Sequence, residues 1–204
     1  MKEHIRLLVE NLFNDIYDID NENNLTIEIA DELYNYKMGD IYYLNKNPYA
    51  ICCGESFMFS DNRTRFLLLE KPGINKFAKV PSYLEILGKK NENDENGYEN
   101  TQIIKNEYYL KSFPAFEYCC NFNDNAYLPS IYELKILYNN MDLLNKKLIY
   151  IPNCKMFLIN YSNTISSSQK NASDCFIITK QSEDKDIGFQ DKMTWGLIYP
   201  FIKI

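Results

Sequence analysis

Few side chains in this sequence could carry out catalysis, and they do not form a catalytic pattern. The only histidine is His4, so a serine or cysteine nucleophile activated by histidine is not expected. The seven glycines are scattered and do not form the glycine-rich loop that cradles a phosphate. The sequence therefore predicts a protein that is not an enzyme and needs no cofactor. The alternative that stays open is an enzyme whose catalytic groups are a pair of carboxylates.

The cysteines could bind a metal or form disulfides, but their spacing argues against both. They lie at six positions: Cys52, Cys53, Cys119, Cys120, Cys154 and Cys175. Adjacent cysteines do not easily bond each other, and the sequence has no Cys-x-x-Cys pair for zinc or redox chemistry. Because apolar or aromatic residues such as Ile51 and Phe176 flank them, we expect Cys52, Cys119 and Cys175 to be reduced and largely buried.

Two groups of acidic residues could attract a cation. The groups are Glu92, Asp94 and Glu95, and Glu183, Asp184 and Asp186. Calcium needs several oxygen ligands at the spacing of a binding loop, which neither group has. We therefore expect no metal site, and we interpret both groups as solvated faces, the first within a polar loop over residues 89–100.

The side chains best suited to binding lie in a polar segment over residues 160–174, which is expected to be a loop. They are Tyr161, Asn163, Gln169 and Asn171. An aromatic ring offers a flat contact and the amides offer adaptable hydrogen bonds, which is the chemistry of many binding loops. We predict that these four residues bind a ligand; the alternative is an ordinary polar loop without one.

Composition and charge limit the possible folds and partners. With 204 residues, 46% of them hydrophobic and 15% aromatic, the chain is long enough for one domain with a sizeable core. The net charge of −6 argues against nucleic acid or an anionic membrane as the main partner. The sequence has no apolar run of about 18 residues and no recognisable signal peptide, so membrane insertion is not expected.

The elements that position these residues begin with an N-terminal helix. Apolar residues recur there at helical spacing, which predicts an amphipathic helix over residues 2–17. The polar stretch over residues 18–24 indicates a linker, so we expect one unit at residues 1–24 and a main domain at residues 25–204. The helix either packs on the domain or docks on a partner or a second copy.

Two further helices are predicted in the middle of the chain, over residues 101–120 and 129–141. The start of the second is well marked. Pro129 fixes φ at a helix entry, and Ser130 and Glu133 can form a capping box. The apolar residues that then share one helical face are Ile131, Leu134, Leu137 and Tyr138. We expect this face to be buried.

Strand signals lie on both sides of these helices. Residues 38–44 and 49–53 predict a hairpin, with a turn at residues 45–47. Further short strands are predicted over residues 63–70, 148–151, 156–159, 175–178 and 195–204. This arrangement predicts an α+β domain whose two helices flank small antiparallel sheets built from both ends of the domain.

Three motifs in the middle of the chain also resemble a known family. They are Gly97-x-x-Asn100-Thr101, Ala115-x-x-Tyr118-Cys119 and Leu128-Pro129-Ser130-x-x-Glu133-Leu134. In this order they resemble the bacterial C-type-lectin-like domains, which include adhesin and fimbrial-tip domains, the variable proteins of diversity-generating retroelements and, more distantly, the formylglycine-generating enzymes. The resemblance implies a C-type-lectin-like fold and a role in recognition.

The chain lacks the residues by which calcium-dependent lectins bind sugar. Those lectins use a Glu-Pro-Asn or Gln-Pro-Asp turn and a Trp-Asn-Asp strand, whereas the nearest turn here is Ile151-Pro152-Asn153. We therefore expect any binding to be calcium-independent. The residues around Cys154 and Cys175 likewise differ from the motifs of the formylglycine-generating enzymes.

Together these features predict a non-enzymatic recognition or adhesion module that binds a protein or glycan through loops over residues 160–174 and 182–194. The first alternative is a structural or assembly subunit, such as part of a phage tail or surface fibre, docked by residues 2–17. The second is an enzyme of the formylglycine-generating type. We expect a cytoplasmic protein as synthesised, with a surface or virion location if a signal is trimmed or a particle carries it.

Overall fold

The computed structural model describes residues 36–55, 64–79, 87, 90–91, 93–152, 154, 156, 158, 163–180 and 185–204. Residues Lys37–Ile204 form one compact unit. The expected helix over residues 2–17, its linker and the domain boundary after it lie outside the described residues. None of the helices described has the length and apolarity that crossing a membrane requires.

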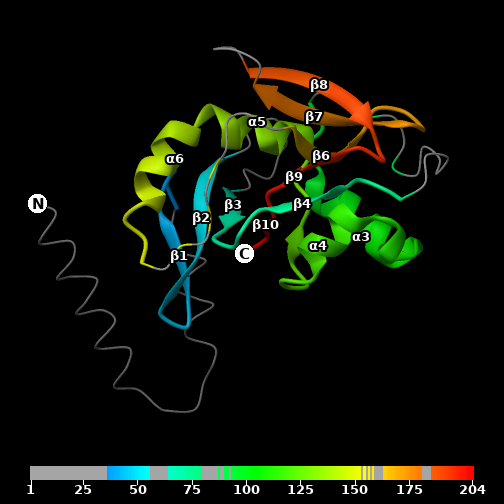
Figure 1. Ribbon diagram of the computed structural model, residues 1–204. Helices are drawn as coiled ribbons and strands as arrows, with labels where there is room; N and C mark the ends of the chain where they lie inside the picture. Colours follow the sequence, from blue (N-terminus) through cyan, green and yellow to red (C-terminus); the bar gives the residue numbers. More distant parts are fainter. Residues whose placement is uncertain are drawn as a thin grey trace, which may run out of the picture. The chain divides into compact units, whose positions relative to one another are not determined.

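The unit has an α+β architecture with two five-stranded sheets (Figure 1). The first sheet has the order β1 (Ile41–Leu44), β2 (Asn47–Glu55), β3 (Thr64–Leu68), β10 (Phe201–Ile202), β5 (Ala126–Tyr127). The second has the order β4 (Gly73–Lys76), β9 (Trp195–Ile198), β6 (Thr164–Gln169), β7 (Asp174–Lys180), β8 (Lys185–Asp191). The helices are α3 (Gly97–Glu107), α4 (Pro114–Cys120), α5 (Ile131–Asn139) and α6 (Met141–Leu148), with a short 3-10 helix η1 (Leu110–Ser112). The strand pairs are antiparallel except for β6 and β9, which are parallel.

The hairpin predicted near the start of the unit is confirmed. Strands β1 and β2 pair antiparallel, with Ile41 opposite Ile51. The turn between them contains Asn45 and Lys46, whose φ angles of 50° and 64° lie in the left-handed region. Two such residues in succession match the twist of paired strands, which is why two-residue turns of this kind join hairpins.

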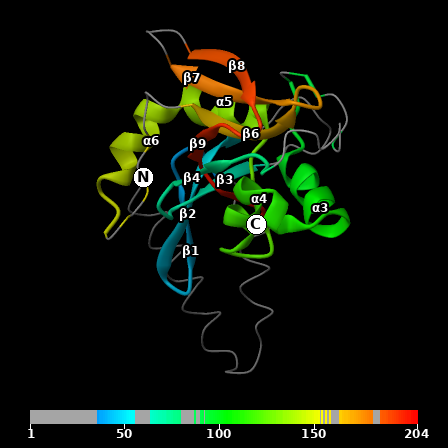
Figure 2. The same cartoon turned by 45° about the vertical axis from the view of Figure 1, so that its right-hand side comes forward.

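Helix α5 begins where the sequence predicts. The backbone N–H of Glu133 donates to Ser130 Oγ at 3.3 Å, and the N–H of Ser130 donates to Glu133 Oε2 at 2.8 Å. This reciprocal pair is a capping box, which satisfies backbone donors that the first helical turn leaves unpaired. The predicted apolar face is fully buried, and α5 packs on β2, β6 and β7 (Figure 2).

The first of the two predicted helices is interrupted, so a single helix over residues 101–120 is wrong. Helix α3 ends before Tyr108, whose backbone is extended at φ −131° and ψ 163°. Helix α4 starts with Pro114 at its first position. Because proline disfavours the α conformation of the residue before it and lacks an N–H, it begins a new helix here and cannot continue an old one.

The strand predicted over residues 148–151 is also wrong. Leu148 is the last residue of α6, and the N–H of Ile149 still donates to Asn145 O at 3.4 Å. Buried Leu144 and Leu148 face the core, whereas Ile149 and Tyr150 are exposed. The apolar run is therefore the end of an amphipathic helix and the turn after it. Of the segment 156–159, Met156 and Leu158 are described and do not lie in a strand.

The polar segment predicted as a loop over residues 160–174 contains a buried strand. Residues Thr164–Gln169 form β6, and each of them is buried. The serine hydroxyls have partners within the fold: Ser166 Oγ donates to Phe176 O at 2.8 Å, and Ser168 Oγ donates to Asp94 Oδ2 at 2.6 Å. A polar strand can be buried when each hydroxyl is bonded in this way.

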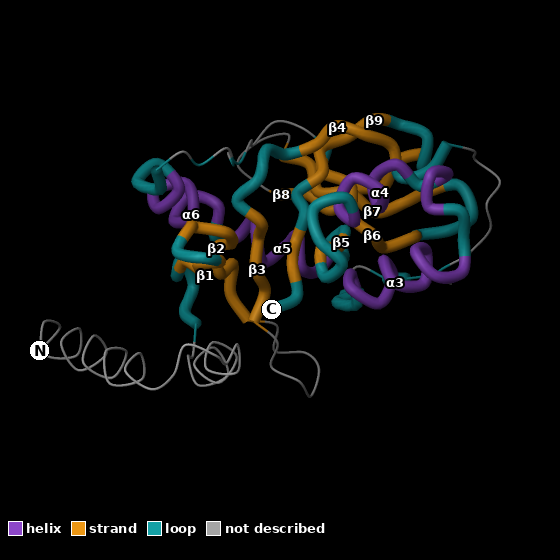
Figure 3. Tube along the Cα trace, turned by 90° about the horizontal axis from the view of Figure 1, so that it is seen from below, coloured by secondary structure: helices purple, strands orange, loops and turns teal. Residues whose placement is uncertain are grey.

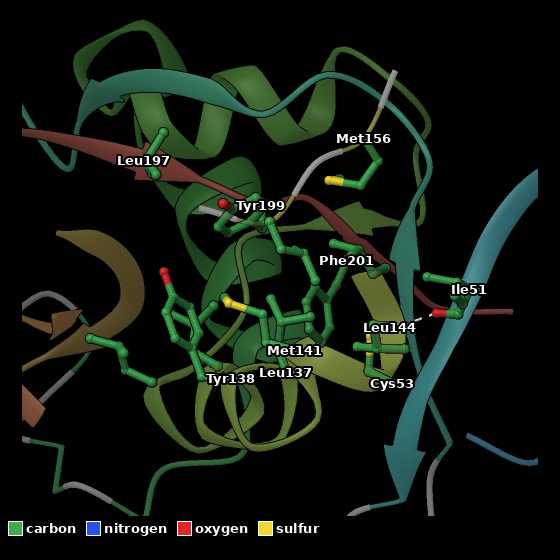
Figure 4. Close-up of a cluster of buried hydrophobic side chains, with 14 of the residues drawn as sticks. Ile51, Cys53, Leu137, Tyr138, Met141, Leu144, Met156, Leu197, Tyr199 and Phe201 are labelled. Carbon is green, nitrogen blue, oxygen red and sulfur yellow. Dashed lines mark hydrogen bonds between the residues drawn. The ribbon is translucent and has the colours of Figure 1, made fainter. Parts of the chain in front are cut away.

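The buried apolar residues form two clusters. The larger one joins α5 and α6 to β2, β9 and β10, and Figure 4 shows Tyr138 and Met141 from the helices together with Tyr199 and Phe201 from the C-terminal segment. The smaller cluster joins α3 and α4 to β6, β7 and β9. The closing strand β10 lies between β3 and β5, with Phe201 opposite both Leu67 and Tyr127.

The predicted burial of three cysteines is confirmed. Cys52, Cys119 and Cys175 are each 0% exposed, and all three are free thiols. Burial raises the pKa of the Cys175 thiol to about 12 and that of Cys119 well above its usual range. A thiolate would lose its hydration at Cys119 and Cys175, so these two thiols stay protonated at neutral pH.

Candidate functional site

A small hollow opens on the surface of the second sheet. Its volume is about 230 Å³, and it is lined by Ile74, Asn163, Trp195, Gly196 and Leu197. These residues come from β4, from β9 and from the residue directly before β6. Figure 3 shows β4 and β9 side by side. In sequence, β4 thus lies about 90 residues from Asn163 and about 120 residues from β9, whereas Asn163 and β9 are about 30 residues apart.

The register of β4 and β9 brings two large apolar side chains to the surface together. The strands pair antiparallel, with Ile74 opposite Leu197 and Lys76 opposite Trp195. Residues opposite each other, or two apart on one strand, share a face of the sheet. Ile74 and Trp195 therefore lie on one face, and they are 65% and 59% exposed. Most large apolar side chains in this unit are buried, so this exposed pair is a candidate contact surface.

Gly196 allows the residues at the start of β6, which form one side of the hollow, to lie close to β9. A Cβ atom at Gly196 would lie 2.9 Å from Asn163 O and 2.7 Å from Ile165 Cγ1. Side chains do not approach at such distances, so only glycine fits between β9 and the start of β6. The N–H of Leu197 donates to Asn163 O at 2.8 Å, which fixes the backbone of Asn163 against β9.

The amide of Asn163 has a defined orientation. Its Nδ2 donates to Gln190 Oε1 at 3.1 Å, and Gln190 Nε2 in turn donates to Thr194 O at 3.3 Å. This chain assigns the donor and acceptor ends of both amides. Among the described residues, none donates a hydrogen bond to Asn163 Oδ1, so this oxygen can accept one from a ligand.

A cation lies against the exposed tryptophan. Lys76 Nζ is 5.4 Å from the centroid of the Trp195 ring. The negative potential of the ring face attracts the ammonium, and such a contact is worth about 0.5–1 kcal/mol at an exposed site. Lys76 therefore helps to hold the indole in one orientation.

The four residues predicted to bind a ligand are not together. Asn163 lines the hollow, whereas Tyr161 lies outside the described residues. Gln169 is 1% exposed on β6, and its amide has no hydrogen-bond partner among the described residues. Asn171 Oδ1 accepts from the N–H groups of Ser173 and Asp174, both at 2.8 Å, so it stabilises the turn between β6 and β7. A ligand-binding role for these residues stays a prediction.

Three residues near the hollow were not predicted from the sequence: Ile74, Lys76 and Trp195. Gln190 lies in the segment 182–194, which is predicted to be a binding loop, but residues Lys185–Asp191 of that segment form strand β8. The available signal was the single tryptophan followed by a glycine at the start of a strand. That signal does not reveal which strand would pair with it. The pairing of β4 with β9 decides the site, and a pairing over such a separation leaves no local pattern in the sequence.

A second group of polar residues is buried and holds the scaffold together. Asp94 is 8% exposed, and its Oδ2 accepts from Asn100 Nδ2 at 2.9 Å and from Ser168 Oγ. Asn100 Nδ2 also donates to Ser167 Oγ at 3.1 Å. These bonds join α3 to β6. The interpretation of Asp94 and Glu95 as a solvated face is therefore wrong, because Glu95 is only 3% exposed.

Glu133 is the central member of a neighbouring buried group. Its Oε1 lies 2.6 Å from Arg65 Nε and accepts from the hydroxyl of Tyr127 at 3.0 Å. Burial raises the pKa of Glu133, against the opposing effect of the Arg65 charge. A shifted carboxyl group can mark an active site, but this one is 1% exposed and bonded to the cap of α5. Its contacts fit a structural role.

Metal ligands do not converge in the described part of the chain: no three side chains from His, Cys, Asp and Glu come together there. Both carboxylate oxygens of Asp94, which could otherwise coordinate a cation, accept hydrogen bonds within the fold.

Comparisons with known proteins find one informative likeness. No family model matches the chain, and no curated protein matches it. The fold is similar to the crystal structure of a fimbrial protein from Bacteroides ovatus ATCC 8483, with a TM-score of 0.66 and 16% sequence identity. The match covers 83% of this chain and 49% of that one, so the chain spans about half the length of the fimbrial protein it matches. At this identity the likeness is one of fold.

Proposed function

We propose that this chain is a non-enzymatic recognition module of C-type-lectin-like fold that serves a surface-fibre or adhesion system. It binds its protein or glycan partner through the hollow beside Trp195. The observation that carries the proposal is the exposed pair Ile74 and Trp195 on a rigid sheet, next to an oriented amide at Asn163. Exposed aromatic side chains with polar neighbours are the usual anchors of recognition sites.

The three sequence motifs support the finer assignment of the fold. The hydroxyl of Thr101 accepts from the N–H of Leu128 at 3.1 Å, and Asn100 bonds to Asp94. A Cβ atom at Gly97 would lie 2.5 Å from the N–H nitrogen of Ser130. The motifs therefore bring α3 and the start of α5 into close contact. This gives a physical reason for their spacing in the C-type-lectin-like domains they resemble.

Binding can be tested with the tryptophan as reporter. The chain has a single tryptophan, so its fluorescence reports on the hollow alone. We expect purified protein to be captured by a member of an immobilised panel of surface proteins and glycans, and its emission to shift on binding. Replacing an exposed aromatic anchor costs about 2 kcal/mol or more of affinity, so Trp195→Ala should abolish capture.

A matched control uses another exposed aromatic residue. Tyr150 is 82% exposed after α6 and does not line the hollow. Tyr150→Ala should therefore bind as the unmodified chain does. Equal capture of all three proteins would place the contact surface elsewhere.

The fimbrial likeness favours one alternative, a structural subunit of a fibre. In that role the chain would contact copies or partners at a cell surface or on a particle, and residues 2–17 would supply a docking helix. Light scattering of the full chain distinguishes the two roles. A monomer at micromolar concentration supports the recognition module, whereas a concentration-dependent assembly supports the subunit.

A further inference from the structure

We infer that the hollow beside Trp195 binds a single sugar residue, with one face of the pyranose ring on the indole and a hydroxyl bonded to Asn163 Oδ1. The inference deepens the proposed function and rests on it, since it names the ligand of the same hollow. It requires no bound calcium, because the contacts named here come from side chains alone.

The size of the hollow limits the ligand. Sites that enclose a drug-sized molecule have volumes of about 300–1,000 Å³, and this hollow has about 230 Å³. A stable protein interface buries about 800 Å² on each partner around several anchors. Ile74 and Trp195 are the two exposed apolar side chains that line the hollow. The apolar surface formed by Ile74 and Trp195, called the platform below, is therefore better matched in size to one sugar ring than to a folded protein.

The chemistry of the platform favours carbohydrate among small ligands. The face of an aromatic ring carries negative potential, which attracts the partly positive hydrogens on the apolar face of a pyranose. Ile74 lies on the same sheet face and extends the apolar surface beyond the indole. Lys76 keeps the indole from rotating freely. A sugar residue offers the flat C–H face that such a platform requires.

The polar wall of the hollow suits hydroxyl groups. Asn163 Nδ2 donates a hydrogen bond to Gln190 Oε1, which fixes the orientation of the Asn163 amide. Oδ1 can then accept from a sugar hydroxyl, and the second hydrogen on Nδ2 can donate to another. The five lining residues include no charged side chain. A charge that bears on the hollow is the Lys76 ammonium, 5.4 Å from the centroid of the Trp195 ring, but the polar wall itself offers hydrogen bonds to hydroxyl groups and not a countercharge.

The test uses methyl glycosides as probes. A panel of methyl α- and β-pyranosides of glucose, galactose, mannose and N-acetylglucosamine is titrated into the full chain. Binding is followed by Trp195 fluorescence and by saturation-transfer NMR. We expect at least one probe to give a saturable signal at millimolar concentration, with transfer strongest to the ring C–H groups of one face. No saturable signal from any probe would overturn the inference.

Variants locate the contact. Trp195→Ala should abolish saturation transfer, and Asn163→Ala should raise the Kd about fivefold through the loss of one hydrogen bond. Tyr150→Ala is the matched control and should bind unchanged. Because Trp195 and Asn163 are surface residues, melting curves should stay close to that of the unmodified chain. Undiminished transfer with Trp195→Ala in a folded protein would overturn the inference.

Failure of the inference and failure of the proposed function are distinguishable. A protein partner captured through Trp195, with no glycoside bound, would refute the sugar assignment and leave the recognition site in place. Glycoside binding that survives every change in the hollow would refute both.

Discussion

The backbone packed against Gly97 leaves no space for a side chain at this position. A Cβ atom there would lie 2.5 Å from the backbone nitrogen of Ser130 and 2.9 Å from Leu128 O. These are backbone atoms at the start of α5, which cannot move without disturbing its cap. We predict that Gly97→Ala lowers the free energy of unfolding by about 2–3 kcal/mol, as overpacking in a tight core does. Urea denaturation followed by circular dichroism measures the change.

The chain offers a matched control for this substitution. A Cβ atom at Gly188 would lie 3.5 Å from Ile177 Cγ1, which is an ordinary contact. Gly188→Ala should therefore change stability by no more than about 0.5 kcal/mol. If both variants unfold at the same urea concentration, the close approach of Gly97 to α5 does not limit the fold.

Neighbouring cysteines should differ in reactivity. Cys119 is buried, and burial raises the pKa of its thiol well above the usual value. Cys120 is only partly buried, so its thiol is more accessible although its pKa is also raised. Alkylation requires both access and thiolate. We predict that iodoacetamide at pH 8 modifies Cys120 and Cys154 before Cys119 and Cys175.

Peptide mapping by mass spectrometry measures these rates for each site. Denaturant should make the four cysteines react alike, because unfolding returns their pKa values to the usual range. Equal rates for Cys119 and Cys120 in the folded protein would contradict the burial described above.

At the scale of elements, the cap of α5 should contribute measurably to stability. Ser130→Ala removes the oxygen that accepts the N–H of Glu133. Loss of an N-cap costs about 1 kcal/mol, so we predict a lower melting temperature with an unchanged structure. Thermal unfolding measures it. Ser173→Ala, at an exposed turn residue, is the control and should leave the melting temperature unchanged.

Local signals explain which elements the sequence predicts. The hairpin β1–β2 and helix α5 were predicted because their turn residues, cap and apolar spacing lie within about ten residues of each other. Strand β6 is not predicted, because its serines can be buried only through hydrogen bonds to other segments. Ser168 Oγ donates to Asp94 Oδ2, and Ser166 Oγ donates to Phe176 O. A serine-rich segment carries no sign of such partners, so its sequence alone predicts a loop.

The binding hollow was only partly predictable for the same reason. Asn163 was identified by its amide in a polar segment, whereas Ile74 and Trp195 become neighbours through the register of β4 and β9. Gln169 and Asn171 have the same side-chain chemistry as Asn163, yet one is buried and the other stabilises a turn. Residue type alone does not separate these three situations.

At the scale of the whole molecule, the closing strand should be critical. Phe201 is buried and lies opposite residues of both β3 and β5. Replacing a buried phenylalanine by alanine typically costs about 3–5 kcal/mol, so we predict that Phe201→Ala is partly or fully unfolded at 37 °C. Ile204→Ala, at a residue 47% exposed beyond the strand, should keep its stability within about 0.5 kcal/mol. Chemical denaturation of both variants tests this.

The position of β10 also has a consequence for biosynthesis. Strands β3 and β5 are made long before their shared neighbour, since about 70 residues follow β5 before Phe201 is added. Until Phe201 and Ile202 leave the ribosomal exit tunnel, both strands present unpaired edges on which nascent chains can aggregate. Completion of the first sheet therefore waits until almost the whole unit has been synthesised. The two strand edges are thus open to pairing with other chains for most of the time that this unit is being synthesised.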